Sequence, residues 1–225
     1  MSLIIAYKEF DNNNKSVIKI LSDSQITDGN YRTSKRYDKV LPMTIPNTAI
    51  HFYIGITGLS KFTDYMSYLY KNNLLNFDLL TDISSTSNLD LFFSDIVKKF
   101  IEDFKIINND VDINVNFLTV INNEIYVSKL MADMTIETEQ CTKYGVIGIE
   151  ANTVEMLLDY WYNRNRFFND ANCLHPFLIM NYMTEKNMTI GYPIIKHTYP
   201  NSICNVHTYN SFNEILSNEQ FDFKS

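Results

Sequence analysis

The order in which sequence periodicities follow one another limits this chain of 225 residues to a small set of folds. Apolar runs typical of strands come first, between residues 2 and 56, and two segments with apolar residues at steps of three and four follow them. The succession then repeats, with strand-like segments over 113–148, two helical patterns, and a last strand over 192–197. This grouping predicts an α+β fold in which two antiparallel sheets stack and a helical layer covers each outer side.

The first strands are predicted from short apolar runs and from the turn residues between them. Residues 2–7 and 16–21 flank a cluster rich in Asn at 11–14, which favours a hairpin turn. Residues 40–43 and 49–56 give two further strands. We expect these four strands to form one antiparallel sheet that carries all the candidate site residues.

The helices are predicted from wide apolar stripes. The stripe over 60–70 follows Ser60, a residue type that favours the N-cap position, and a broader stripe covers 89–104. Stripes of this width predict packing against a large flat partner such as a sheet. Residues 152–155 have the composition of a capping box, which predicts the start of a third helix, and a fourth helical pattern covers 172–184.

Composition narrows the class of protein. A chain with 45% hydrophobic residues can bury one sizeable core, so we expect one domain over 1–200 and a C-terminal tail over 201–225. The net charge of −7 opposes a nucleic-acid surface, and no apolar stretch approaches the ~20 residues of a membrane span. We therefore expect a cytoplasmic protein of a bacterium, or of a phage in its host, with neither nucleic acid nor membrane as a partner.

The cysteines and histidines do not indicate a metal centre. Their spacing lacks the pairs typical of metal ligands, and the odd number of cysteines is typical of reduced structural thiols. These residues are Cys141, Cys173 and Cys204, together with His51, His175, His197 and His207. No metal and no cofactor are expected.

The start of the chain combines two chemical functions in one residue. Ser2 follows the initiator Met1, which is normally removed before a residue as small as serine. Removal would give Ser2 a free α-amine beside its hydroxyl, with a reference pKa of ~7.7–8.0 and a useful neutral fraction near neutral pH. Because a hydroxyl paired with an N-terminal amine is an activated nucleophile, Ser2 is the first candidate catalytic residue.

Three further motifs follow in order. Residues 23–30 read Asp-Ser-Gln-Ile-Thr-Asp-Gly-Asn, Lys39 comes 16 positions after Asp23, and residues 54–59 read Ile-Gly-Ile-Thr-Gly-Leu. With the Ser2 start, this order resembles the proteasome-type N-terminal-nucleophile hydrolases, in particular the HslV peptidase and Anbu. Residues 144–150 and 187–194 are similar to later segments of the same family.

The resemblance implies a role for each matching residue. Ser2 would be the nucleophile, Lys39 would favour the developing alkoxide, and Asp23 would keep Lys39 charged and oriented. The backbone N–H of Gly58 would stabilise an oxyanion, with Thr27 and Gly55 as supporting residues. Taken separately, each residue favours an ordinary structural interpretation, as a chain start, a surface residue at a strand end or a turn glycine. Taken together, their order and spacing favour the family.

The resemblance also implies an architecture and partners. It predicts the four-layer αββα sandwich that the periodicities indicate, and self-assembly of the chain into a ring or spiral. A peptide or protein would be the substrate. An ATPase partner is possible, and the sequence does not show whether one exists.

Some residues depart from the family pattern and leave alternatives open, beginning with Ser2 in place of the commoner threonine nucleophile. Residues 148–150 read Gly-Ile-Glu where the family usually has Ser-Gly-Gly or Ser-Gly-Ser, and Asn187 aligns with an acid in many members. A catalytically inactive assembly protein, acting as a ring scaffold or as a decoy for a host protease or its ATPase, is therefore the alternative to a peptidase. A small-molecule amidase on the same fold is a third hypothesis.

Overall fold

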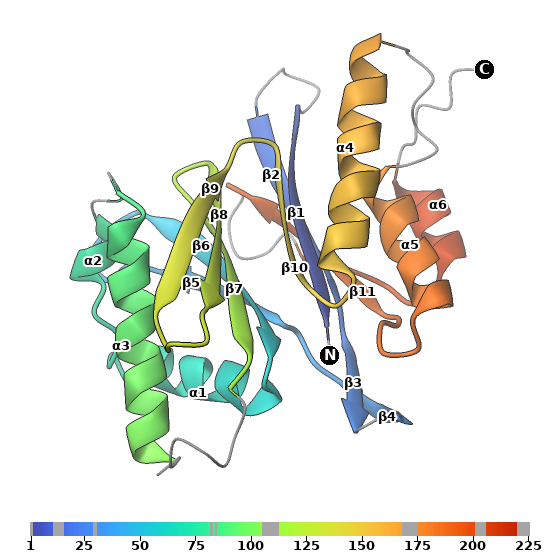
Figure 1. Ribbon diagram of the computed structural model, residues 1–225. Helices are drawn as coiled ribbons and strands as arrows, with labels where there is room; N and C mark the ends of the chain where they lie inside the picture. The colour runs from blue at the N-terminus through green and yellow to red at the C-terminus, as the bar shows by residue number, and fades with distance from the viewer. Residues whose placement is uncertain are drawn as a thin grey trace.

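Two five-stranded antiparallel sheets lie face to face between two helical layers in the computed structural model (Figure 1). The structure describes residues 2–10, 16–28, 31–81, 83, 85–104, 113–167, 175–200 and 206–219. This arrangement confirms the predicted α+β fold, a four-layer αββα sandwich. Among the described helices, none has the length and apolarity that crossing a membrane requires.

The first sheet has the strand order β10-β1-β2-β11-β12. Its strands are β1 (Leu3–Phe10), β2 (Ser16–Asp23), β10 (Tyr144–Gly148), β11 (Ile194–Tyr199) and β12 (Val206–Tyr209). The helices on its outer side are α4 (Ala151–Phe167), α5 (Pro176–Lys186) and α6 (Phe212–Asn218). The predicted hairpin of the first two strands is confirmed, since Ile4 pairs with Ser22 and Phe10 with Ser16.

The second sheet has the strand order β5-β6-β7-β8-β9. Its strands are β5 (Val40–Thr44), β6 (His51–Gly58), β7 (Val115–Ile121), β8 (Glu124–Leu130) and β9 (Ile136–Cys141). The helices α1 (Ser60–Lys71), α2 (Asp78–Thr81) and α3 (Ser87–Asp103) cover its outer side. A separate ribbon of β3 (Gln25–Asp28) and β4 (Tyr31–Arg36) projects from one end of the sandwich (Figure 1).

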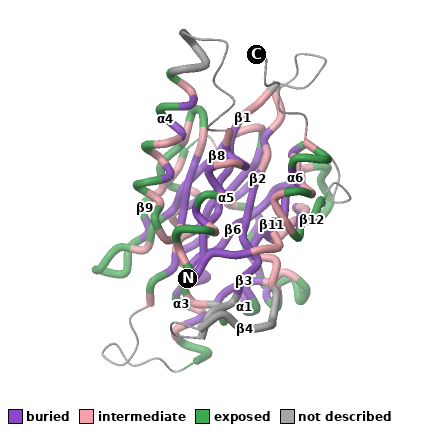
Figure 2. The backbone as a smooth tube through the Cα atoms, turned by 90° about the vertical axis from the view of Figure 1, so that its right-hand side faces the viewer, coloured by how far each residue is buried: buried purple, intermediate pink, exposed green. Residues whose placement is uncertain are grey.

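Three apolar layers hold the sandwich together, one between the sheets and one under each set of helices. Because successive side chains of a strand point to opposite faces, Leu3 and Ile5 of β1 pack toward the helices while Ile4 packs toward the other sheet. Figure 2 shows buried residues running through the strands and exposed residues gathering on the helices and turns. Burial of both faces explains why β1 is a continuous apolar run.

One prediction about the sheets is wrong. The first four predicted strands do not form one sheet, because β1 and β2 lie in the first sheet whereas β5 and β6 lie in the second. The ribbon of β3 and β4 occupies the chain between them. The candidate site residues are consequently divided between the two sheets, and the site lies where the sheets meet.

Two predicted helix starts also differ from the structure. The N-cap of α1 is Leu59 with an extended backbone and no capping side chain, so Ser60 is the first helical residue. The predicted capping box at 152–155 lies inside α4, which begins at Ala151 directly after Glu150. Glu150 has a φ of 60°, and this turn places the helix start earlier than the composition of 152–155 indicates.

The C-terminal part of the fold extends past the predicted boundary at residue 200. Residues 206–219, expected as a tail, contribute β12 and α6. Ile194 of β11 pairs with Tyr209 of β12, and Ile215 of α6 is completely buried. The predicted fourth helix begins at Pro176, and residues 172–174 of that prediction lie outside the described residues.

Candidate active site

Ser2 lies at the entrance to β1, directly against the turn that follows β10. Its carbonyl oxygen accepts a hydrogen bond from the Ile149 N–H at 2.8 Å, and the residue is only 8% exposed. Gly148 has a φ of 108°, and a Cβ at this position would lie 1.9 Å from the Ser2 carbonyl oxygen. Glycine is therefore required for the chain to approach Ser2 this closely.

Asp23 connects the first residue of β1 to a buried lysine. It ends β2 and is completely buried. Its Oδ1 accepts a hydrogen bond from the Leu3 N–H at 2.8 Å, and its Oδ2 accepts one from Lys39 Nζ, also at 2.8 Å. One carboxylate thus holds both the peptide unit next to Ser2 and the ammonium group of Lys39.

Lys39 links the two sheets. Its backbone carbonyl accepts from the Ile56 N–H at 2.9 Å, while its Nζ also donates to the Gln25 carbonyl at 2.8 Å. Burial lowers the pKa of Lys39 and raises the pKa of Asp23, and in each group the charge of the partner opposes the effect of burial. The two groups compensate each other's desolvation, so either one alone would be an unpaired buried charge.

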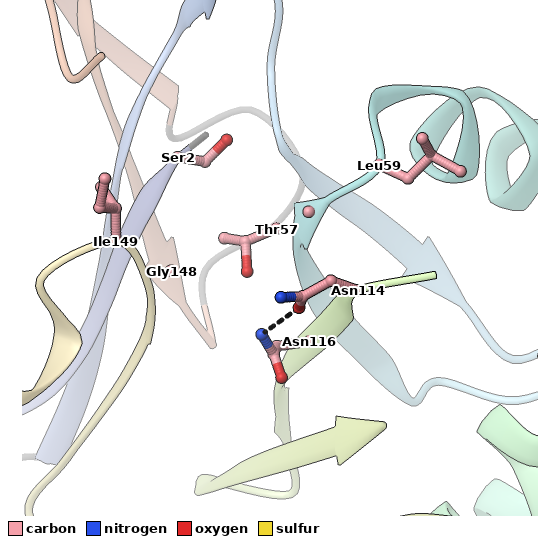
Figure 3. A pocket seen from close by; sticks show the side chains of 8 residues that line it. Ser2, Thr57, Leu59, Asn114, Asn116, Gly148 and Ile149 are labelled. Carbon is pink, nitrogen blue, oxygen red and sulfur yellow. Dashed lines mark hydrogen bonds between the residues drawn. The ribbon is translucent and has the colours of Figure 1, made fainter. Parts of the chain in front are cut away.

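Gly58 ends β6 and lines the same pocket as Ser2; Figure 3 shows this pocket with Thr57 and Leu59, the neighbours of Gly58 in the chain. Its φ of 106° is accessible to glycine, and a Cβ here would lie 1.8 Å from the Asn114 carbonyl oxygen. The pocket has a volume of about 390 Å³. Its walls are formed by Ser2, Thr57, Gly58, Leu59, Asn114, Asn116, Gly148 and Ile149.

The two supporting residues are placed differently. Gly55 does not line the pocket; a Cβ at this position would lie 3.0 Å from Ile4 Cδ1, so glycine allows the two sheets to approach each other behind the site. Thr27 lies on β3, and the role predicted for its side chain falls outside the described residues.

The polar residues that line the pocket were not predicted from the sequence. Thr57 and Asn116 are directly opposite each other in the β6–β7 pair, and Asn114 precedes β7. Further along the same strands, Tyr53 and Leu118 fill the apolar layer between the sheets. Along one face of each strand, apolar residues thus give way to polar ones toward the pocket. This change could have indicated the pocket, but only with the register of the two strands known.

The fold is that of the proteasome-type N-terminal-nucleophile hydrolases, which confirms the resemblance at the level of structure. Anbu from Yersinia bercovieri superposes with a TM-score of 0.67 at 15% identity, covering 95% of this chain and 90% of that one. The helical assembly of the Anbu complex from Pseudomonas aeruginosa gives 0.64 at 11% identity, covering 96% and 90%. Eukaryotic HslV from Trypanosoma brucei gives 0.54 at 12% identity, covering 87% and 98%.

Another similar structure contains a bound ligand. It is the Thiobacillus denitrificans BPH in complex with epoxomicin, with a TM-score of 0.60 at 12% identity over 87% of this chain and 97% of that one. No family model and no curated protein match the sequence. At these identities the similarity concerns the fold, and the chemistry of the site has to be argued from its own residues.

Proposed function

We propose that the chain is a self-assembling peptidase or amidohydrolase that uses Ser2 as its nucleophile after removal of Met1. The observation that carries this proposal is the position of Asp23, which binds the Leu3 N–H and Lys39 Nζ at once. This arrangement fixes a buried cation beside the peptide unit of Ser2. A fixed positive charge in a site of low dielectric stabilises an alkoxide more strongly than it would in water.

The reaction begins with attack of Ser2 Oγ on the carbonyl carbon of an amide. The α-amine of Ser2 accepts the hydroxyl proton, directly or through a water, and the carbonyl oxygen becomes an oxyanion to which the Gly58 N–H donates. Collapse breaks the C–N bond, and the leaving amine takes the proton from the α-ammonium. Water then hydrolyses the ester, releasing a carboxylic acid and restoring the Ser2 hydroxyl.

Assembly and substrate belong to the same proposal. The structure from Pseudomonas aeruginosa is a helical assembly, which supports a ring or spiral of identical subunits for this chain. Such a particle would enclose its sites and admit peptides or unfolded proteins. A cytoplasmic location and an ATPase that delivers substrate complete the hypothesis.

One observation favours a second candidate function, an inactive assembly protein acting as scaffold or decoy. Ile149 lines the pocket next to Ser2, within the segment 148–150 where the family pattern has a Ser-Gly-Gly or Ser-Gly-Ser turn. An apolar side chain there supplies no hydrogen bond to a reacting group. This alternative predicts an assembled particle that neither hydrolyses peptides nor reacts at Ser2.

Covalent labelling by epoxomicin separates the two functions. We expect a single adduct on the N-terminal peptide of the untagged protein, together with hydrolysis of unstructured peptides. Ser2→Ala should abolish both. Ser22→Ala is the matched control, because Ser22 is completely buried on β2 and does not line the pocket. If a correctly assembled particle shows neither labelling nor hydrolysis, the peptidase hypothesis is wrong and the assembly-protein hypothesis takes its place.

A further inference from the structure

One part of the pocket beside Ser2 is lined by polar, uncharged side chains. Thr57 and Asn116 are cross-strand neighbours in the β6–β7 pair, so their side chains stand on the same face of the sheet. Asn116 Nδ2 donates to Asn114 Oδ1 over 3.5 Å, a long hydrogen bond that leaves the two amides loosely coupled. This part of the pocket therefore presents the Thr57 hydroxyl and two carboxamides together.

Thr57 contributes an unused hydrogen-bonding group to this part of the pocket. The residue is 3% exposed, and within the described part of the chain its Oγ1 has no hydrogen-bond partner. Figure 3 shows the hydroxyl directed toward Asn114 and Asn116. A buried hydroxyl without a partner costs the fold about 1–3 kcal/mol, so a bound group that hydrogen-bonds to it would gain affinity.

Two apolar side chains also line the pocket, Ile149 and Leu59. The pocket thus combines apolar surface with the hydrogen-bonding groups of Thr57, Asn114 and Asn116. This combination suits a substrate side chain that has methylene groups and a terminal polar group.

We propose that the pocket selects substrates with a carboxamide side chain, as in glutamine or asparagine, next to the scissile amide. The inference rests on the proposed function and specifies its substrate class. A carboxamide carries both donors and acceptors, and the Thr57 hydroxyl and the two asparagine amides also do both. Thr57 and Asn116 are therefore specificity-determining residues, distinct from the groups that carry out the reaction.

Charged and apolar side chains are disfavoured for different reasons. None of the eight lining side chains is charged, so a carboxylate or ammonium would lose its water without gaining a side-chain counter-ion. An apolar side chain of the same length would leave the Thr57 hydroxyl and the asparagine amides without partners. Sites built to hydrogen-bond a substrate group discriminate strongly against analogues that lack it.

Three internally quenched peptides that differ in one residue test the inference. The varied residue is Gln, Glu or Met, placed on either side of the scissile bond, because these side chains have similar length and differ in polarity and charge. For the assembled wild-type particle we expect kcat/KM for the Gln peptide to be about tenfold higher than for the Met and Glu peptides, roughly the effect of one or two hydrogen bonds.

Thr57→Val keeps the shape of the side chain and removes its hydroxyl. The ratio of kcat/KM for Gln over Met should fall about fivefold in this variant. Thr119→Val is the matched control, because Thr119 Oγ1 is also buried without a partner among the described residues and Thr119 does not line the pocket. The control should keep the wild-type ratio, and thermal unfolding of both variants verifies that they fold.

A binding measurement keeps this inference separable from the proposed function. Fluorescence anisotropy with the Ser2→Ala particle compares the same three peptides without turnover, and the Gln peptide should bind about tenfold more tightly. If epoxomicin does not label Ser2 but the Gln peptide still binds more tightly, the peptidase function is wrong, whereas the preference of the pocket for a carboxamide stands. Equal binding of the Gln and Met peptides, or a Thr57→Val variant with an unchanged ratio, would overturn the assignment.

Discussion

The carboxylate of Asp23 lies 2.8 Å from the ammonium group of Lys39, and the two residues are 0% and 5% exposed. Asp23 ends a strand of the first sheet, whereas Lys39 directly precedes a strand of the second. The ion pair therefore joins the two halves of the sandwich at the point where β1 begins. Its environment makes it both a structural contact and the electrostatic centre of the proposed site.

Replacing Lys39 alone by Met should destabilise the protein severely. The Asp23 carboxylate would stay buried without its cation, and we expect the free energy of unfolding to fall by about 3–5 kcal/mol. The double variant D23N/K39M removes both charges and should recover most of this loss. Urea unfolding of the wild type, the two single variants Lys39→Met and Asp23→Asn, and the double variant measures the coupling. Equal stability of Lys39→Met and wild type would contradict the buried pair.

The loss of stability in the Lys39→Met variant should depend on pH. Burial raises the pKa of Asp23, and the opposing charge of Lys39 would be absent. The folded variant then holds a proton more tightly than the unfolded chain, whose Asp pKa is ~3.9. The stability of the variant relative to the wild type is therefore greatest at low pH, and it falls as the pH rises through the raised pKa of Asp23. Unfolding at about pH 5 and about pH 8 should show the larger deficit at about pH 8.

Gly148→Ala should disrupt the approach of the β10 turn to Ser2. The added Cβ would lie 1.9 Å from the Ser2 carbonyl oxygen at a φ of 108°, so backbone atoms would have to move. We expect a loss of about 2 kcal/mol or more in the free energy of unfolding. Gly191→Ala is the control, since its Cβ would meet the flexible Gln25 side chain at 3.1 Å. Similar stability of the two variants would contradict the close contact.

Ile149→Ser should raise the reactivity of Ser2. The serine would place a hydroxyl on the pocket wall, one position after the serine of the family's Ser-Gly-Gly pattern, and we expect epoxomicin labelling to accelerate roughly tenfold or less, the range of one modest hydrogen bond. Ile149→Ala removes the same apolar side chain without adding a hydroxyl. Equal acceleration by both variants would mean that access, and not the hydroxyl, limits the reaction.

Glu9 is predicted to contribute stability that acid removes. Its burial raises the pKa, but hydrogen bonding with His175 and Lys19 prevails and lowers it from 4.5 to about 2. Because the folded-state value is depressed, this stability is present above pH 4.5 and is lost as the pH falls toward about 2. Glu9→Gln should flatten the dependence of the free energy of unfolding on pH within this window.

The ion pair of Glu124 with Lys8 provides the comparison for Glu9. Glu124 has a side chain that is 37% exposed, against 21% for Glu9, so water screens its interaction more strongly. Glu124→Gln should therefore change the acid dependence less than Glu9→Gln does. The opposite order would contradict the assignment of the Glu9 cluster as the acid-sensitive contact.

The sequence predicts those parts of the fold in which local pattern and tertiary packing agree. The predicted strand over 2–7 falls in β1, which begins at Leu3 and has both faces buried, and the wide stripe over 89–104 falls in α3, which ends at Asp103 and packs against a sheet. The contact of Asp23 with Lys39, expected from the resemblance, is present at 2.8 Å. The catalytic roles of Ser2, Asp23, Lys39 and Gly58 stay predictions.

Other features depend on information that no local pattern carries. The ribbon over 25–36 lacks an apolar alternation, so neither its strands nor the passage between the two sheets was predicted. The short β12 and α6 each bury few side chains, Tyr209 and Ile215 among them. Thr57 and Asn116 meet only through the register of two strands almost 60 positions apart in the chain.

The intact mass of the untagged, assembled protein tests the central claim most directly. We predict a mass that corresponds to a chain beginning at Ser2, because the free α-amine is the base of the proposed reaction. A particle that retains Met1 and still hydrolyses peptides would contradict the account, since Ser2 would then carry no free amine.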